Sequence, residues 1–167
     1  MKVIENKALL MKLRHPGQVL NAIPESKAVG PNEVAVRWDV PQVHALRAMN
    51  IAAPSPITGK YDWPGRFKPF DHQKTTAAFL TNHKRAFCFS HMGTGKTASA
   101  IWAADFLMQR GLVRRALVIC PMSIMDSAWR SDLFSFAMHR KVDIAHGSAK
   151  KRKEIIASDA EFVIINF

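Results

Sequence analysis

One eight-residue segment, Ser90-His91-Met92-Gly93-Thr94-Gly95-Lys96-Thr97, restricts the possible folds more than any other part of this chain. An apolar, strand-like run at 85–89 precedes it, and a helical pattern at 96–109 follows it. A glycine-rich turn between a strand and a helix directs backbone N–H groups toward one point, and the positive end of the helix adds to their attraction for an anion. The sequence therefore predicts a phosphate-binding loop (P-loop) in an α/β fold.

The residue types within this loop suit a bound ATP. Lys96 is expected to reach the β- and γ-phosphate oxygens, and the hydroxyl of Thr97 is expected to bind Mg²⁺. Gly93 and Gly95 stand where a side chain would block the phosphate or resist a positive φ. Met92 and Thr94 complete the expected nucleotide-binding segment, and Ser90 replaces the glycine with which the general pattern begins. The plain alternative is a glycine turn before a buried helix.

A second candidate lies upstream, at the start of a helical pattern at 71–81. Gln73 follows Phe70-Asp71-His72, about twenty residues before Lys96. A glutamine amide offers a donor and an acceptor, which match N6 and N7 of adenine. A glutamine at a helix start is commonly a solvated surface residue, but its distance from the P-loop favours an adenine contact.

The region 70–167 alternates apolar strands with helices, which indicates a parallel sheet covered by helices on both faces. Ser123 and Asp126 have the spacing of a capping box at the start of one of these helices. Trp129 shares a helical face with Met125 and Phe136, so we expect it in the core. The expected strands are 85–89, 116–120, 142–145 and 162–165.

The first part of the chain has a different pattern. Residues 1–50 predict a small α+β module, with strands at 8–13 and 33–38 and a helix that begins at Pro41. Prolines and glycines concentrate in 51–69, so we expect a linker there, anchored by aromatic side chains and without helix or central strand. The predicted domains are therefore 1–50, a linker at 51–69, and a nucleotide-binding region at 70–167.

Charge and cysteine content indicate the kind of partner and the cellular compartment to expect for this chain. The chain has 24 Lys and Arg against 13 Asp and Glu, a net charge of +11, which favours an anionic partner such as nucleic acid, although a basic surface also serves solubility alone. No segment has the pattern of a membrane span or of a signal peptide. Cys88 and Cys120 lie in apolar runs and are expected to be buried, reduced thiols. We expect the cytoplasm of a bacterial or phage-infected cell, or the nucleus if the source is eukaryotic.

The order of the motifs is that of superfamily-two helicases, and the set most resembles the Swi/Snf-type DNA translocases. The resemblance covers about 67–167 and rests on FKPFDHQ, SHMGTGKT, ALVICPMSIMDSAW and FVIINF. Cys120, Pro121, Ser123 and Trp129 match motif Ia of these proteins, and Asn166-Phe167 matches a later element. In addition, Val36-Arg37-Trp38-Asp39 is similar to the small accessory domains of annealing helicases.

The resemblance implies a RecA-like lobe that uses ATP and Mg²⁺ and moves on DNA, or on RNA. It also implies that Pro121 and Ser123 lie near a nucleic-acid phosphate, an arrangement that a hydroxyl and helix-start N–H groups suit. Ser123 could equally cap its own helix, or do both.

The Asp-Glu motif that holds Mg²⁺ and polarises water in these motors is not found among the 167 residues, because Asp159 and Glu161 precede a strand instead of ending one. We therefore expect a fragment of a longer protein with a second RecA-like lobe, and negligible hydrolysis by these residues alone. The alternatives are a non-hydrolysing nucleic-acid-binding module that keeps a P-loop fold, and a P-loop kinase or unrelated NTPase.

Overall fold

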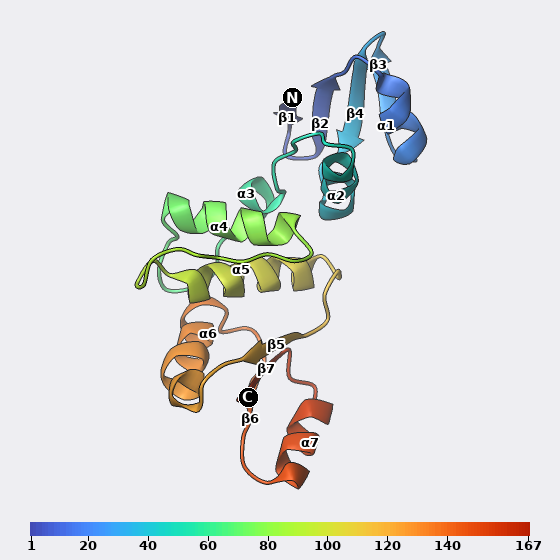
Figure 1. The fold of residues 1–167 in the computed structure, drawn as a ribbon. Coiled ribbons are helices and arrows are strands. Elements are labelled where there is room, and N and C mark those ends of the chain that lie inside the picture. Colours follow the sequence, from blue (N-terminus) through green and yellow to red (C-terminus); the bar gives the residue numbers. More distant parts are fainter. The chain divides into compact units, whose positions relative to one another are not determined.

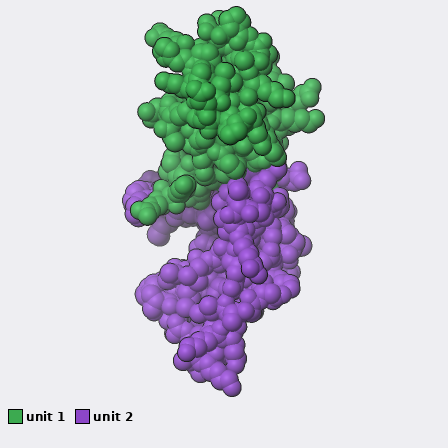
Figure 2. Space-filling model, turned by 90° about the vertical axis from the view of Figure 1, so that its right-hand side faces the viewer, with its two compact units in different colours: residues 1–61, 78–86 green, residues 62–77, 87–167 purple.

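The computed structural model describes all residues from 1 to 167, which form two compact units. Figure 1 labels the helices and strands of the chain. Unit 1 comprises residues 1–61 and 78–86, and unit 2 comprises 62–77 and 87–167 (Figure 2). Helix α4 (Asp71–Asn82) contributes residues to both units. No helix combines the length and the apolar character that crossing a membrane requires.

Unit 1 contains an antiparallel four-stranded sheet in the order β1-β2-β4-β3. Its core alternates along the two central strands, where Leu9 faces Val36 and Met11 faces Val34. The strands predicted at 8–13 and 33–38 and the helix predicted from Pro41 form, as β2 (Ala8–Lys12), β4 (Glu33–Arg37) and α2 (Val40–Ala48). The unit also contains β1 (Lys2–Ile4), α1 (Pro16–Ala22) and β3 (Lys27–Gly30).

The segment predicted as a linker is more ordered than its composition indicates. It contains a short helix, α3 (Ile57–Lys60), and Ile57 is fully buried. The prediction that 51–69 excludes a helix was therefore wrong, because Pro56 stands just before the first helical residue, where proline needs no hydrogen-bond donor. The hydroxyl of Ser55 also lies 2.6 Å from that of Thr81, which ties this segment to the end of α4.

Unit 2 contains a parallel sheet in the order β5-β7-β6, made of β5 (Ala116–Ile119), β7 (Phe162–Ile165) and β6 (Val142–Ala145). Helices α5 (Lys96–Gln109) and α6 (Ser131–Phe136) supply Ile101 and Leu133 to a core that includes Ile164. Helix α7 (Ala149–Ala157) packs through Ile155 against Val163, which points to the opposite face. The predicted parallel sheet with helices on both faces is thus confirmed.

The strand predicted at 85–89 does not form, and this prediction was wrong. The side chains of Phe87 and Phe89 are 81% and 90% exposed, and their rings stack on each other at 5.8 Å. Apolar residues make a strand only when a neighbouring strand pairs with their backbone groups. The sheet of unit 2 has three strands, and none of them pairs with this segment.

A buried ionic network anchors α5. The carboxylate of Asp105 is inaccessible to solvent and accepts hydrogen bonds from Arg140 Nε at 2.6 Å and His139 Nε2 at 2.9 Å. Gln109 adds a third donor at 3.0 Å. Arg140 also binds Glu161 through Nη1 at 2.5 Å. The network therefore links the helix that follows the P-loop to the connections before β6 and β7.

Glu161 should make the stability of unit 2 depend on pH. Burial raises its pKa, but the Lys141 amide and the Arg140 guanidinium outweigh that effect and lower the pKa below the ordinary value of 4.5. Such a carboxylate stabilises the fold above its unfolded-state pKa, and this contribution is lost as the pH falls through the folded-state value.

We expect the unfolding free energy to decrease below about pH 4.5, and to decrease less steeply in Glu161→Gln. Urea unfolding of unit 2 at several pH values measures the two slopes. Glu154→Gln, at an exposed position of α7, is the matched control and should keep the original slope. Identical slopes in all three proteins would contradict this role of Glu161.

Candidate functional site

The loop 90–97 has the backbone conformation that a phosphate-binding loop requires at its glycines. Gly93 and Gly95 both have φ of 75°, in the left-handed region that favours glycine. Gly95 also stands immediately before α5, as its N-cap residue. A Cβ at Gly95 would collide with the amide nitrogen of Gln73. This position therefore requires glycine for its conformation, and a side chain there would also displace the Gln73 amide.

Lys96 is the first residue of α5, and its ammonium group folds back over the loop. Its Nζ donates to the carbonyl oxygens of Ser90 at 2.8 Å and His91 at 2.7 Å. The first turn of α5 carries no acidic residue, so nothing there opposes an anion at its N-terminus. Thr97 follows in the same turn and is half-buried.

The remaining predicted residues of the loop behave differently from one another. Thr94 closes the turn, because its hydroxyl donates to the His91 carbonyl at 2.8 Å. Met92 is 95% exposed, and its side chain forms no part of the loop's internal structure.

The structure brings Gln73 to the P-loop, across 21 residues of sequence. Its Nε2 donates to the Thr94 carbonyl at 3.3 Å, and its Oε1 accepts from the amide of Phe70 at 3.0 Å. His72 reaches the same Thr94 carbonyl through Nε2 at 3.1 Å, and its ring stacks on that of Phe70. Gln73 therefore bridges the start of α4 and the P-loop.

His72 and Phe70 are neighbours of the loop that the sequence did not identify as site residues. The sequence alone does not distinguish a histidine near a helix start that contacts the P-loop from one that contacts only solvent. The signal that could have found them is their adjacency to Gln73 in FKPFDHQ.

The two cysteines have different surroundings, so the expectation of two buried thiols was wrong for one of them. Cys120 is buried, and desolvation raises the pKa of its thiol. Cys88 is only half-buried, because the strand predicted around it does not form. The hydrogen bond with the Ser90 hydroxyl lowers the pKa of the Cys88 thiol, and the charge of Lys96 contributes in the same direction.

Pro121 and Ser123 lie where β5 ends, and both are exposed. Because β5 and β7 are parallel, with Ile119 opposite Ile165, the chain leaves the sheet at the same edge after both strands. Cys120-Pro121 and Asn166-Phe167 therefore emerge side by side. This is the edge of an open α/β sheet at which ligands usually bind.

The predicted capping box at Ser123 and Asp126 is absent, and that prediction was wrong. The segment begins with a 3₁₀ turn, η1 (Met122–Ile124), and a π-helical stretch, η2 (Met125–Arg130), before α6, and neither has a side-chain cap. Asp126 instead forms an ion pair with Arg130 at 3.2 Å. A capping box needs Ser123 at the N-cap, three residues before Asp126, but Ser123 lies inside η1, whose N-cap residue is Pro121. Trp129 packs against the core with Met125 and Phe136 as predicted.

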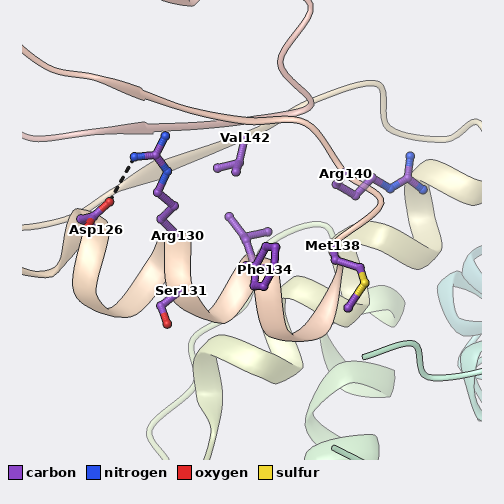
Figure 3. A pocket seen from close by; sticks show the side chains of 8 residues that line it. Asp126, Arg130, Ser131, Phe134, Met138, Arg140 and Val142 are labelled. Atoms are coloured by element: carbon purple, nitrogen blue, oxygen red, sulfur yellow. Dashed lines mark hydrogen bonds and ion pairs between the residues drawn. The ribbon is translucent and has the colours of Figure 1, made fainter. Parts of the chain in front are cut away.

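A pocket of about 340 Å³ lies beside η2 and α6 (Figure 3). Arg130 and Arg140 both line it, but Arg130 pairs with Asp126 and Arg140 pairs with Asp105. None of the predicted nucleotide-binding residues contributes to this pocket. Since its cations are already paired with carboxylates, we assign no anionic ligand to it.

Comparison with known proteins supports the resemblance to Swi/Snf-type helicases. No protein-family model matches the chain. It is 32% identical over 100 residues to the DNA excision repair protein CSB of Oryza sativa subsp. japonica, a match that covers 55% of this chain and 8% of that protein. The fold is similar to that of the Sulfolobus solfataricus SWI2/SNF2 ATPase core, solved in complex with dsDNA. That match has a TM-score of 0.54 and 22% identity, and it covers 62% of this chain and 22% of the other.

The chain thus spans a small part of each of these proteins. The structural match agrees with the predicted α/β class. In addition to its parallel sheet, the chain contains the antiparallel sheet of unit 1. Together, the motifs, the sequence match and the shared fold confirm the resemblance to Swi/Snf-type helicases.

Proposed function

We propose that this chain is the ATP-binding portion of an ATP-dependent DNA translocase, which couples ATP hydrolysis to movement along nucleic acid. One observation carries the proposal: Gln73, the two left-handed glycines and Lys96 converge on one loop at the start of α5. The amide proposed to contact adenine and the ammonium group proposed to contact the phosphates are therefore both next to this loop.

The residues present fit a nucleotide triphosphate. Gly93 has no atom within 4 Å of the position of a Cβ, so the backbone is open to a ligand there. Lys96 donates to two neutral carbonyl oxygens, and phosphate oxygens are stronger acceptors for the same group. The Thr97 hydroxyl would hold Mg²⁺, which when bound neutralises phosphate charge.

Three features support DNA as the partner. The chain carries a net charge of +11, and the structural neighbour is an ATPase core in complex with dsDNA. Pro121 and Ser123 are exposed at the sheet edge where β5 ends. We propose that the Ser123 hydroxyl and nearby backbone N–H groups contact a phosphate of the DNA.

Gln73 should give the site a preference for adenine. Its amide keeps one N–H and one lone pair beyond the bonds to Thr94 and Phe70. Guanine presents the opposite donor and acceptor pattern, so we expect GTP to bind roughly tenfold more weakly than ATP. Calorimetric titration of the chain with each nucleotide and Mg²⁺ measures this preference.

Gln73→Ala should bind the two nucleotides with similar affinity. Gln18→Ala, at an exposed position of α1, is the matched control and should keep the preference. Equal binding of ATP and GTP by the unaltered chain would instead favour an unrelated NTPase, in which the position of Gln73 is a coincidence.

A further inference from the structure

Positive charge is unevenly distributed in unit 1. This unit holds ten Lys and Arg residues against four Asp and Glu residues. The four acidic residues all precede α2 in the sequence; they are Glu5, Glu25, Glu33 and Asp39. Residues 40–61 and 78–86, which form the rest of the unit, contain no carboxylate side chain.

The acid-free part of unit 1 contains a cleft of about 360 Å³. It lies between the C-terminal half of α2 and the end of α4, whose labels appear in Figure 1. Five of its seven lining residues are cationic or carry an imidazole, and the other two are Ala48 and Asn82. We call these five residues the basic cleft: His44, Arg47, His83, Lys84 and Arg85.

The cations of the basic cleft have no carboxylate partner. Arg47, Lys84 and Arg85 form no ion pair. Arg37 of the same unit, in contrast, pairs with both Glu25 and Asp39. Three uncompensated cations at one concave place attract an anion, because a cleft concentrates their field.

Hydrogen bonds to neutral groups hold the Arg47 side chain in place. Arg47 donates to the Ala53 carbonyl and lies 3.4 Å from Nε2 of His83. The Nδ1 atom of His83 lies 2.7 Å from the Phe79 carbonyl, so Nδ1 carries a proton and Nε2 can accept from Arg47. The guanidinium is thus oriented before any ligand binds.

The carbonyl groups at the two helix ends are the features that would repel an anion. Two of these carbonyls, both near the end of α4, are already engaged, because His44 contacts that of Thr81 at 2.8 Å and His83 contacts that of Phe79. The lining offers cations and imidazoles, and it has no Phe, Tyr or Trp on which a base could stack. The cleft therefore suits a phosphate group and not a nucleobase.

We propose that the basic cleft binds the phosphodiester backbone of a nucleic acid. We expect this contact to be independent of base sequence, because the lining residues would interact with phosphate charge and not with the edges of the bases. It is also separate from the P-loop, since no residue of 90–97 lines the cleft. Unit 1 would thus supply a nucleic-acid contact that does not depend on ATP.

The test is DNA binding by the full 167-residue chain after charge reversal in the cleft. Lys84→Glu/Arg85→Glu should bind a labelled DNA duplex at least about tenfold more weakly, and the slope of log affinity against log salt should decrease by about two. Lys12→Glu/Lys27→Glu makes the same charge change at exposed positions elsewhere in unit 1 and should change the affinity much less. Fluorescence anisotropy over a salt series measures both.

Two further measurements distinguish a loss of DNA binding at the cleft from a loss of the P-loop or of the fold. ATP binding should be unchanged in Lys84→Glu/Arg85→Glu, so a failure of the cleft is distinguishable from a failure of the P-loop. If charge reversal disturbs folding, as circular dichroism would report, Lys84→Gln/Arg85→Gln replaces it with the same expected loss of about two in salt slope.

Equal losses in the cleft and control variants would overturn the proposal, because they would indicate only a general charge effect. Displacement of DNA by inorganic phosphate, beyond the effect of sodium chloride at equal ionic strength, would also overturn it. That result would identify the cleft as a site for a small anion.

Discussion

Replacing Lys96 with alanine should weaken ATP binding by about 100-fold, or close to 3 kcal/mol. The loop 90–97 contains no other Lys or Arg. The ammonium group already lies over the loop, bonded to the carbonyls of Ser90 and His91. Phosphate oxygens carry negative charge and the two carbonyl oxygens do not, so the ammonium group binds the phosphates more strongly and stabilises bound ATP.

The measurement is calorimetric titration of the unaltered chain and of Lys96→Ala with ATP and Mg²⁺. Lys150→Ala removes the same charge from an exposed position of α7 and should bind ATP as the unaltered chain does. Equal affinities in all three proteins would show that the loop does not hold the phosphates. The alternative of a nucleic-acid-binding module without nucleotide function would then be favoured.

Replacing Asp105 with alanine should destabilise unit 2 by about 3–5 kcal/mol. Its carboxylate is completely buried and receives bonds from Arg140, His139 and Gln109. The Arg140 side chain is itself only 14% exposed. Without Asp105 it keeps Glu161 as its ion-pair partner, but the buried guanidinium loses a strong acceptor.

Hydrogen exchange of the α5 amides in increasing urea measures this loss within unit 2. Asp126→Ala breaks the exposed i,i+4 ion pair with Arg130 and should cost only about 0.3–0.5 kcal/mol. A double variant, Asp105→Ala/Arg140→Ala, should be less destabilised than the sum of the two single variants, because the residues interact directly. Additive losses would contradict the coupling.

Local sequence features predicted helix α5 with the bounds that the structure has, 96–109. Its glycine start and its strongly apolar composition are properties of the segment itself. The strand pattern of 33–38 and 162–165 was likewise sufficient, because each of these runs finds a pairing partner within its own unit. Gln73 was identified by its distance from the P-loop, but its bond to Thr94 was not.

What the sequence could not predict depends on partners that are distant along the chain. The run 85–89 has the composition of a strand, yet no strand pairs with it, and Phe87 and Phe89 stay exposed. In the sequence, Asp105 is a single charged residue within an apolar helix. Its role could not be predicted, because its partners His139 and Arg140 lie more than thirty residues away. The basic cleft was missed for the same reason, since α2 and the end of α4 are far apart in sequence.

The central claim is that residues 90–97 bind the phosphates of ATP, and residue-resolved NMR tests it most directly. The account predicts that the amide signals of Gly93, Gly95 and Lys96 shift saturably when ATP and Mg²⁺ are titrated into the isotope-labelled chain. Signals of α7 should stay in place. Saturable shifts elsewhere in the chain, with the loop signals unmoved, would contradict the assignment of this loop as the ATP site.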